Sequence, residues 1–593
     1  MKKLVSMLAI ASALALNWAC DDEDPINLAE PELTTPAATS VSVNGSVDIT
    51  FNFTAEAGFA SAAVTNDEGG TGSIKTNGTA GATSGSIVVT FAAGATPGAG
   101  SVTVTITDGE GDTDEATATI TVSPSAVPSI AGIPATASIA GGETLQVAGV
   151  VLTAQDGFAS SNAFTLTVND GDPINLSTLI SGASPATVTI SYETSLEQIG
   201  TNTLVFTLTD ADGDAASFTH VLTVTAPVFP VVVVQDNISA NTTWTKDKIY
   251  ELAGRVTVLD GVTLTIEAGT VIKGQSGTGS NATALLVARG AKLIAEGTAE
   301  EPIIFTSTSD QIVPGLVKSP NLAPDVNGLW GGVIILGKAR ISASNSNGDV
   351  SEVQIEGIPT SDPNGLYGGS DDADNSGVIK YVSIRHGGTN IGAGNEINGL
   401  TLGGVGSGTV IENIEVVANQ DDGIEWFGGT VNVKNIVVWN AGDDGLDTDQ
   451  AWAGTADNFI VVHPTGHCFE LDGPEGSYGA SIQHTFVNGT VVASSATRVS
   501  EDLINTDANS GVILRNIFIT GIATGQKINR VNAANVTFDG VVLNVAADAL
   551  LNYLPAGTTA APAGITAGTT GTKADASVLM WTWAGKAGGL NGL

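Results

Sequence analysis

Acidic side chains recur at a regular spacing in the C-terminal half of the chain. Glu425, Asp447 and Glu470 are separated by 22 and 23 residues, and each follows an apolar residue in a short strand-like run. If these runs stack as neighbouring strands, their carboxylates form a column with a spacing of about 4.8 Å. Carboxylates so close repel one another, which raises their pKa values or requires a cation. Because hard oxygen ligands suit calcium, the column predicts a calcium site.

A second column, three residues earlier, leaves other interpretations open. Asp422, Asp444 and His467 occupy equivalent places in the repeats. Acidic residues before glycine can simply turn the chain between strands, and a pair of carboxylates can also act as acid and base in glycan cleavage. These runs resemble polygalacturonases, which are β-helix hydrolases. However, Cys468 replaces the last glycine of their Gly-His-Gly motif, and no Arg-x-Lys strand follows.

Two tryptophans near the acidic columns are candidates for ligand binding. Trp426 follows Glu425 directly, and Trp452 follows the next repeat. An exposed indole ring can stack on a sugar, whereas tryptophan also serves commonly as a large core residue. Two interpretations of these residues therefore stay open: a carbohydrate contact, and a core position, which is the more common one for tryptophan.

Loops in the N-terminal half carry alternating acidic residues. This pattern resembles calcium-binding turns, although no glutamate closes a 12-residue loop of the EF-hand type. A plain Gly-Asp hairpin is the alternative. The expected calcium ligands are Asp108, Asp112, Asp210, Asp212 and Asp214.

The elements that position the acidic columns repeat every 22 to 24 residues. One strand-like series begins at Gly399, Gly423, Gly445 and Cys468, and a second runs through 414–417, 436–439 and 459–462. Each repeat has two strands, and each strand is in register with the equivalent strand of the next repeat. This arrangement is typical of stacked coils that bury apolar side chains on one another. The leucine ladder of a leucine-rich repeat is missing. The pattern predicts a right-handed parallel β-helix over residues 229–593.

Two modules of similar length precede this region. Residues 57–61 recur as 156–160, and residues 107–112 recur as 209–214. Runs such as 101–107 alternate apolar residues with threonine or serine, which predicts antiparallel sandwiches. The expected β-sandwiches span residues 36–125 and 126–228, and they resemble immunoglobulin-like or cadherin-like domains of bacterial surface proteins. The fold class is therefore all-β.

The first residues predict export and a lipid anchor. Residues 1–19 combine two lysines, an apolar stretch and a small residue before Cys20, as in a secretory signal peptide. The site resembles the lipobox of bacterial lipoproteins, although Asn17 stands where leucine is usual. Residues 21–24 are acidic and resemble the tag that sends lipoproteins of Bacteroidetes-type bacteria to the exterior of the outer membrane. Residues 20–35 then form a tether.

Charge and cysteine content exclude some functions. The chain has 21 basic and 61 acidic residues, giving a formal net charge of -40. Such a field repels phosphate backbones, so no nucleic-acid partner is expected. If lipidation uses Cys20, then Cys468 is the one remaining cysteine, and disulfides do not stabilise the chain.

The start of the repeat region carries a family resemblance. Residues 262–274 read VTLTIEAGTVIKG, and the runs 285–298, 302–307 and 330–337 continue the pattern. They resemble the first coils of a β-helix family that is abundant in Bacteroidetes surface proteins. That resemblance implies a fold and a cellular location, and it implies no particular reaction.

These observations lead to one expectation about function and one alternative. The acidic coils from 399 to 480 contain a single basic residue, Lys434. An enzyme that handles anionic polysaccharides needs cationic side chains beside its carboxylates, so we expect a non-catalytic binding or scaffolding lipoprotein with a glycan or protein partner. The alternative is a polysaccharide hydrolase or lyase, and calcium is the one cofactor expected.

Overall fold

The computed structural model describes residues 28–391, 397–478, 482–532 and 534–593. The protein is all-β and divides into two compact units, Met1–Thr225 and Ala226–Leu593. The expected signal peptide, Cys20 and the acidic tag lie outside the described residues. Within the described ranges, no helix has both the length and the apolar character needed to cross a membrane.

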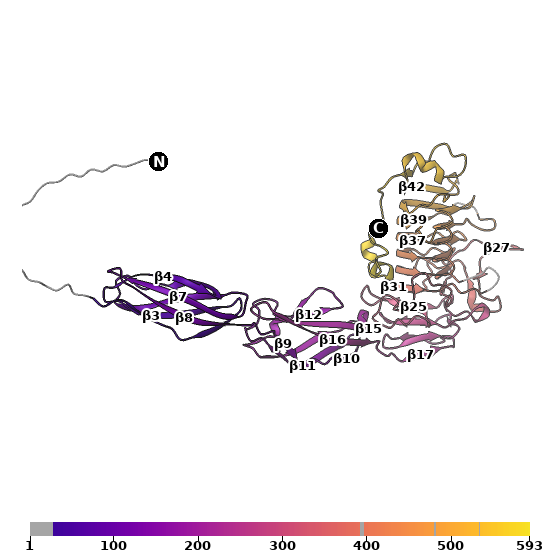
Figure 1. Cartoon of the computed structure of the whole chain (residues 1–593). Coiled ribbons are helices and arrows are strands. Elements are labelled where there is room, and N and C mark those ends of the chain that lie inside the picture. Colours follow the sequence, from indigo (N-terminus) through magenta and orange to yellow (C-terminus); the bar gives the residue numbers. More distant parts are fainter. Residues whose placement is uncertain (1–27, 392–396, 479–481, 533) are drawn as a thin grey trace, which may run out of the picture. The chain divides into compact units, whose positions relative to one another are not determined.

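The first unit contains two β-sandwiches that follow one another along the chain (Figure 1). Their strands alternate buried and exposed side chains, so that Phe51 and Phe91 fill one core and Phe164 and Phe206 the other. The first sandwich pairs sheets β1-β3-β6-β5 and β2-β8-β7-β4, and the second pairs sheets β10-β16-β15-β12-β13 and β14-β11-β9. The strands of the first are β1 (Glu32–Thr34), β2 (Thr39–Ser42), β3 (Ser46–Thr54), β4 (Phe59–Glu68), β5 (Gly70–Thr76), β6 (Ser84–Ala93), β7 (Gly98–Asp108) and β8 (Thr113–Ser123). Those of the second are β9 (Ser129–Ala131), β10 (Thr136–Ala140), β11 (Thr144–Thr153), β12 (Phe164–Val168), β13 (Ile174–Asn175), β14 (Ala186–Glu193), β15 (Gly200–Thr209) and β16 (Ala215–Thr225).

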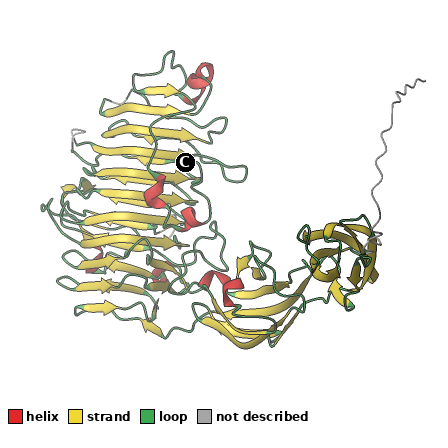
Figure 2. Ribbon diagram, turned by 90° about the vertical axis from the view of Figure 1, so that its left-hand side faces the viewer, coloured by secondary structure: helices red, strands yellow, loops and turns green. Residues whose placement is uncertain are grey.

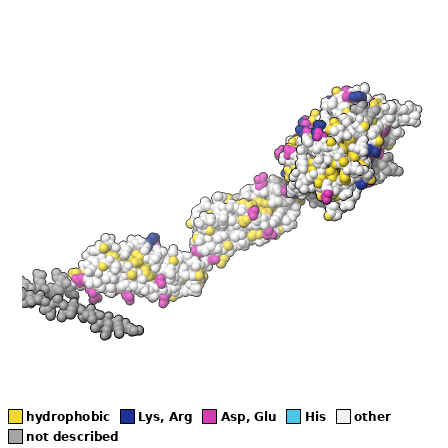
Figure 3. Space-filling view, turned by 90° about the horizontal axis from the view of Figure 1, so that it is seen from above, with side chains coloured by type: hydrophobic (Ala, Val, Ile, Leu, Met, Phe, Trp, Pro, Cys, Tyr) yellow, Lys and Arg dark blue, Asp and Glu magenta, His cyan; other side chains and the backbone are white. Residues whose placement is uncertain are grey.

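The sandwiches carry very little positive charge. Lys75 is the sole basic residue in the sequence from 21 to 228, and its ammonium pairs with Asp48. On the face seen in Figure 3, acidic side chains are scattered over both sandwiches and basic ones are sparse. This surface disfavours polyanionic partners.

The second unit is a parallel β-helix in which strands of successive coils stack along one axis (Figures 1 and 2). A large sheet follows the path β17-β19-β22-β25-β31-β33-β35-β37-β39-β41-β42-β43, with β18, β21 and β24 beside it, and a smaller sheet follows β20-β23-β26-β32-β34-β36-β38-β40. The strands of the large sheet are β17 (Val231–Val234), β18 (Thr242–Trp244), β19 (Ile249–Leu252), β21 (Thr263–Ile266), β22 (Val271–Gly274), β24 (Lys292–Glu296), β25 (Ile303–Ser307), β31 (Gly377–Arg385), β33 (Val410–Val417), β35 (Val433–Trp439), β37 (Thr455–Val462), β39 (His484–Val492), β41 (Val512–Thr520), β42 (Val536–Leu543) and β43 (Ile565–Ala567). Those of the smaller sheet are β20 (Arg255–Val258), β23 (Ala284–Val287), β26 (Val333–Leu336), β32 (Leu400–Gly403), β34 (Ile424–Phe427), β36 (Leu446–Asp449), β38 (Phe469–Leu471) and β40 (Asn505–Thr506).

The interior of the β-helix is a continuous apolar stack. In the smaller sheet, Leu400, Ile424, Leu446 and Phe469 pair in register from coil to coil, and each is at most 1% exposed. Burying one such side chain contributes about 1.5–3 kcal/mol to folding. Each coil therefore depends on its neighbours to cover its apolar face.

A ladder of asparagines bends the long strands of the large sheet. Asn413, Asn435, Asn458, Asn488 and Asn516 all have a left-handed backbone, with φ between 54° and 60°. Asparagine adopts that conformation more readily than most residues. The side chains also bond along the axis: Nδ2 of Asn435 donates to Oδ1 of Asn413 at 3.0 Å, and Asn458 donates to Asn435 at 2.8 Å. The ladder thus holds the coils in register at one corner.

An insertion between β26 and β31 covers part of the smaller sheet. It contains the short strands β27 (Ala343–Asn345), β28 (Gly348–Val350), β29 (Val353–Gln354) and β30 (Leu366–Tyr367). Two ion pairs attach it to earlier coils, Arg255 with Asp362 at 2.8 Å and Arg289 with Glu352 at 3.0 Å. The buried Tyr367 ring lies against Phe427, which brings the insertion beside the acidic repeats.

The C-terminal segment 574–593 folds back over the outer face of the large sheet. Its backbone amides donate to side chains of three different coils: Thr490 at 2.9 Å, Asn458 at 2.6 Å and Glu415 at 2.8 Å. The short helix α1 (Trp583–Lys586) lies in this segment. The segment thereby buries apolar residues that point outward from the coils, among them Val437, Ile460 and Val462.

Candidate functional site

The acidic residues lie on the outer face of the smaller sheet. Strands β34, β36, β38 and β40 pair in parallel so that Glu425, Asp447, Glu470 and Asn505 face one another in succession. Since the residue before each carboxylate points into the apolar stack, the carboxylates point outward. The column expected from the spacing is present in this register.

The second column locks successive coils together. The backbone amide of Asp444 donates to Oδ1 of Asp422 at 2.9 Å, and the amide of His467 donates to Oδ1 of Asp444. These aspartates therefore turn the chain before each strand and also accept a bond from the next coil. The turn interpretation and a chemical role are both compatible with this geometry.

The structure divides the acidic residues into groups that differ from the predicted one. Asp422, Glu425 and Asp447 form one group, in which ligand atoms of all three lie within 4.8 Å of one another. Asp444, His467 and Glu470 form a second group of the same kind. Glu470 thus leaves the predicted calcium trio, and Asp422 takes its place. Asp422 also lies in a third group with the more exposed Asp421 and Asp443.

The first group places three carboxyl groups close together in a buried position. Asp422, Glu425 and Asp447 are 8%, 7% and 9% exposed. Burial, followed by repulsion from neighbouring carboxylates, raises the pKa of each well above its usual range. Among the described residues, none of the ion pairs includes any of the three. Protons or a cation must therefore offset their charge.

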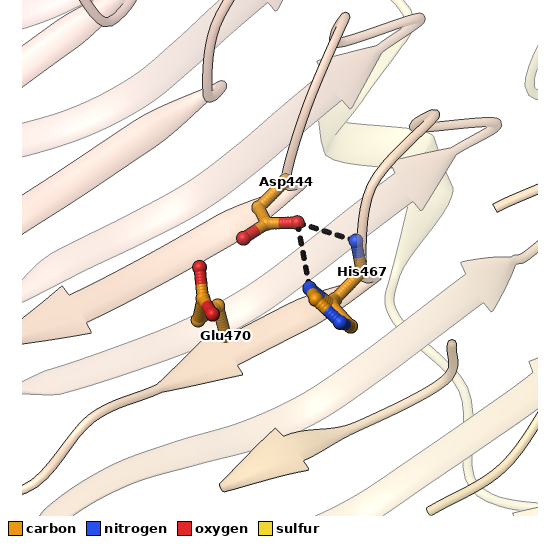
Figure 4. A group of neighbouring side chains, drawn as sticks. All are labelled: Asp444, His467 and Glu470. Atoms are coloured by element: carbon orange, nitrogen blue, oxygen red, sulfur yellow. Dashed lines mark hydrogen bonds and ion pairs between the residues drawn. The ribbon is translucent and has the colours of Figure 1, made fainter. Parts of the chain in front are cut away.

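The second group balances its own charge. His467 Nδ1 lies 3.1 Å from Oδ1 of Asp444, and the Glu470 carboxyl lies on the other side of Asp444 (Figure 4). Although burial acts in the opposite direction, hydrogen bonds from His467 and Glu470 hold the pKa of Asp444 below its usual value. The hydrogen bond to Asp444, and then burial, raise the pKa of Glu470 to about 9. Burial by itself would lower the pKa of His467. The hydrogen bond to Asp444 and the charge of that carboxylate outweigh burial and raise this pKa to about 9. The group therefore holds one carboxylate, one imidazolium and one protonated acid near neutral pH.

Further acids extend this face of the sheet. Burial raises the pKa of Asp449 to about 7 and that of Asp472 to about 6. Within the described part of 397–478, the one basic residue is Lys434, which lies in the large sheet 3.9 Å from Asp457. No lysine or arginine of these coils therefore accompanies the acidic groups.

Of the two interpretations of Trp426 and Trp452, the structure has the core position and not the contact with a ligand. They are 0% and 1% exposed, and their rings stack inside the β-helix with centroids 4.6 Å apart. Trp452 Nε1 donates to the carbonyl of Val431 at 3.0 Å. Trp426 is two residues beyond Ile424 in the same strand, so the alternation of side chains directs it into the core.

The acidic loops of the sandwiches are turns held by their own carboxylates. Oδ1 of Asp108 accepts the backbone amides of Glu110, Gly111 and Asp112 at 2.9–3.0 Å. Oδ1 of Asp210 likewise accepts the amides of Asp212 and Asp214, at 3.1 and 2.8 Å. Among the described residues, the groups of three ligands that meet within 4.8 Å all lie on the β-helix.

Asn398 belongs to the site, and the sequence reasoning missed it. It is 4% exposed, and its Nδ2 donates to Oε2 of Glu425. Leu400 pairs with Ile424, so Asn398 is the counterpart of Asp422 one coil earlier. Extending the Asp422 column by one repeat could have identified it.

Comparisons with known proteins give a family for the second unit. A family model described as a pectate-lyase-like β-helix domain matches residues 236–585. No curated protein was found to be similar in sequence.

Solved structures similar to this chain each cover about a third of it. The fibronectin type III-like modules of Clostridium thermocellum CbhA are 14% identical, with a TM-score of 0.16 over 33% of this chain and 94% of that one. A tandem of titin immunoglobulin domains is 11% identical, with a TM-score of 0.15 over 34% of this chain and 100% of that one. A sialic acid-binding region of a Streptococcus sanguinis adhesin is 11% identical, with a TM-score of 0.14 over 35% of this chain and 82% of that one.

Proposed function

Because the chain belongs to the pectate-lyase-like β-helix family through residues 236–585, we propose that it binds a glycan on this domain. In the proposed function the acidic face of the smaller sheet is the binding surface, and the protein does not cleave its ligand. A fold of this kind hosts several functions, so the residues of the site decide between them.

The proposal of glycan binding without cleavage rests on the charge of the acidic face. Its column of acids, Glu425, Asp447 and Glu470, occupies three successive coils, while Lys434 lies in the other sheet. Cleavage of an anionic polysaccharide requires a cationic group beside the carboxylates, to hold the substrate and stabilise developing negative charge. Hydroxyl groups of a neutral glycan can instead exchange hydrogen bonds with these acids, because a carboxylate accepts such bonds and a protonated carboxyl both donates and accepts them.

One observation favours a second candidate, the hydrolysis of neutral glycans. Asp444 and Glu470 adjoin each other, with the pKa of the first lowered and that of the second raised to about 9. An ionised and a protonated carboxyl are the two forms that glycosidases use as base or nucleophile and as acid. A hydrolase would lose activity on Glu470→Gln, whereas a binding protein would have no such activity.

A glycan array combined with a reducing-sugar assay tests the proposal on the full mature chain. We expect binding to a subset of neutral glycans, with no release of reducing ends from them. Asp447→Asn should weaken binding about 10-fold or more, because it replaces one carboxyl oxygen at the centre of the face with an amide nitrogen that can only donate. The control is Asp539→Asn, which removes the same charge from an exposed ion pair with Arg515 in the large sheet.

Two outcomes would contradict glycan binding without cleavage. Release of reducing ends that Glu470→Gln abolishes would establish the hydrolase instead. A failure to bind any glycan, with the variants equal to wild type, would leave a protein as the partner of this face.

We also propose that Cys20 is acylated and anchors the protein to the outer face of the outer membrane. The support is sequence-based: an export signal precedes Cys20, and acidic residues follow it. Cys20→Ser should move the protein from the membrane fraction to the soluble fraction, because the substitution removes the thiol that would carry the acyl chain. Protease treatment of intact cells should degrade the wild-type protein; retention of the Cys20→Ser chain in membranes would contradict the anchor.

A further inference from the structure

A groove on the first coils of the β-helix lies away from the acidic face. Its volume is about 350 Å³, which is within the range of sites that bind small molecules. Ile304 of strand β25 lines it and belongs to the large sheet, whereas the acidic columns lie on the smaller sheet. The walls are largely apolar and are formed by Phe229, Pro302, Ile304, Pro314, Leu316 and Val317.

One wall of the groove is a loop that a buried carboxylate holds in place. Asp310 is 1% exposed, and its Oδ1 accepts the backbone amide of Ile312 at 3.0 Å and the hydroxyl of Ser319 at 2.8 Å. These two residues flank the segment 314–317 that faces the groove. Lys273 adds a third attachment, since its Nζ donates to the carbonyl of Asp310 at 2.6 Å. The wall is therefore fixed before a ligand binds, which lowers the entropic cost of binding.

The charged residues of the groove favour a cationic ligand. Three of them are acidic, Asp247, Glu300 and Glu301, and one is basic, Lys246. Two of the acids already have partners: Lys246 Nζ lies 2.6 Å from Glu301, and Lys248 Nζ lies 3.5 Å from Asp247. Glu300 belongs to none of the ion pairs among the described residues. The rim therefore keeps a negative charge, and the net charge of -40 on the chain adds to the same field.

We propose that this groove binds a small apolar ligand that carries a cationic amine. The apolar walls bury the hydrocarbon part of the ligand, and the Glu300 carboxylate receives the ammonium group. The small volume suits one aromatic ring or one short alkyl group better than a peptide of several residues. This proposal goes beyond glycan binding and does not depend on it.

Three probes of similar shape test the preference for a cation by calorimetric titration of the full mature chain. Phenethylamine is cationic near neutral pH, phenethyl alcohol is neutral, and hydrocinnamate is anionic. We expect saturable binding of phenethylamine with a Kd on the order of 1 mM, as is usual for a ligand of this size. The alcohol should bind about 3-fold to 5-fold more weakly, because a charge pair on an exposed rim contributes little. Hydrocinnamate should bind about 10-fold more weakly or not at all.

Variants then assign the bound amine to the groove, since the acidic face also attracts cations. Phe229→Ala should weaken the binding of phenethylamine about 5-fold or more, because it removes an apolar wall, and Phe229→Leu should restore most of it. Glu300→Gln should reduce the preference for the amine over the alcohol to less than about 2-fold. The matched control is Glu296→Gln, which removes an exposed carboxylate outside the groove and should leave both affinities unchanged.

Four results would overturn the proposal. The first is the absence of saturable phenethylamine binding to the wild-type chain. The second is an affinity for the alcohol or for hydrocinnamate that equals the affinity for the amine. The third is an unchanged affinity in both Phe229→Ala and Glu300→Gln. The fourth is tighter binding of a tripeptide with an N-terminal phenylalanine, which would make a peptide the ligand. Because Glu300 is exposed, Glu300→Gln keeps the test decisive even if Phe229→Ala disturbs folding.

Discussion

Trp583→Ala should lower the free energy of unfolding of the β-helix by about 3–5 kcal/mol, the usual cost of removing a large buried aromatic side chain. Trp583 is 4% exposed and contacts the rings of Trp439 and His386. The guanidinium carbon of Arg385 lies 5.0 Å from the centre of its ring, an arrangement that is itself stabilising. Its loss would loosen the C-terminal segment from the coils.

The consequence extends to a buried ion pair beneath that segment. Arg385 and Glu415 have fully buried side chains with a 3.5 Å contact, and Glu415 also accepts the amide of Ala584. If the segment detaches, water reaches this pair and the apolar residues beside it. Detachment would expose this buried ion pair and the apolar surface at the same time, so we expect a large loss in the free energy of unfolding.

Denaturant titration followed by tryptophan fluorescence measures the change. Because no tryptophan occurs between residues 21 and 228, the signal reports the β-helix and not the sandwiches. Met580→Ala is a suitable control, since Met580 is 40% exposed in the same segment. A Trp583→Ala midpoint equal to that of Met580→Ala would show that the C-terminal segment contributes little to stability.

In the absence of divalent cations, raising the pH from 7 to 9 should destabilise the β-helix. Folding raises the pKa of Glu470 to about 9 and that of Asp422, Glu425 and Asp447 well above the usual range. The folded state therefore keeps protons that the unfolded state has released, and stability falls as these protons leave. The loss is about 1.4 kcal/mol per pH unit for each proton held in excess.

The histidines do not reverse this sign in the chosen window. His467 has a folded pKa of about 9, so its contribution is also lost between pH 7 and 9. His386, His463 and His484 have lowered pKa values, and they affect stability below about pH 7, where the unfolded imidazoles gain protons. The lowered pKa of Asp444 contributes stability that is already complete at pH 7.

Thermal melts at pH 7, 8 and 9, with EDTA or with calcium, measure the dependence. Calcium should flatten the decline, because a bound cation replaces the protons, and its stabilising effect should be larger at pH 9 than at pH 7. Asp447→Asn should also flatten the decline in EDTA. A midpoint that rises between pH 7 and 9 in EDTA would contradict the protonated state of these acids.

The coil register and the nearness of Glu425 to Asp447 were predictable from the sequence. Both follow from one constraint: stacked coils must bury Ile424 and Leu446 on each other, which directs the residue after each of them outward. The same alternation places Trp426 inside, which agrees with a core position and not with a ligand contact. Local periodicity is sufficient for such features because neighbouring coils are also neighbours in sequence.

The composition of the site depended on contacts that no repeat encodes. Glu470 follows the spacing of the column, yet its carboxyl is hydrogen-bonded to Asp444, which also pairs with His467. The insertion that brings Tyr367 beside the acidic coils, and the C-terminal segment that covers Glu415, come from distant parts of the chain. The sequence by itself therefore determined the all-β class, the stacking and which residues face outward, since alternation and stacking depend on near neighbours in the chain. Only the tertiary structure decided which acids are buried together and which have a partner, because burial and charge pairing depend on every segment that packs against them.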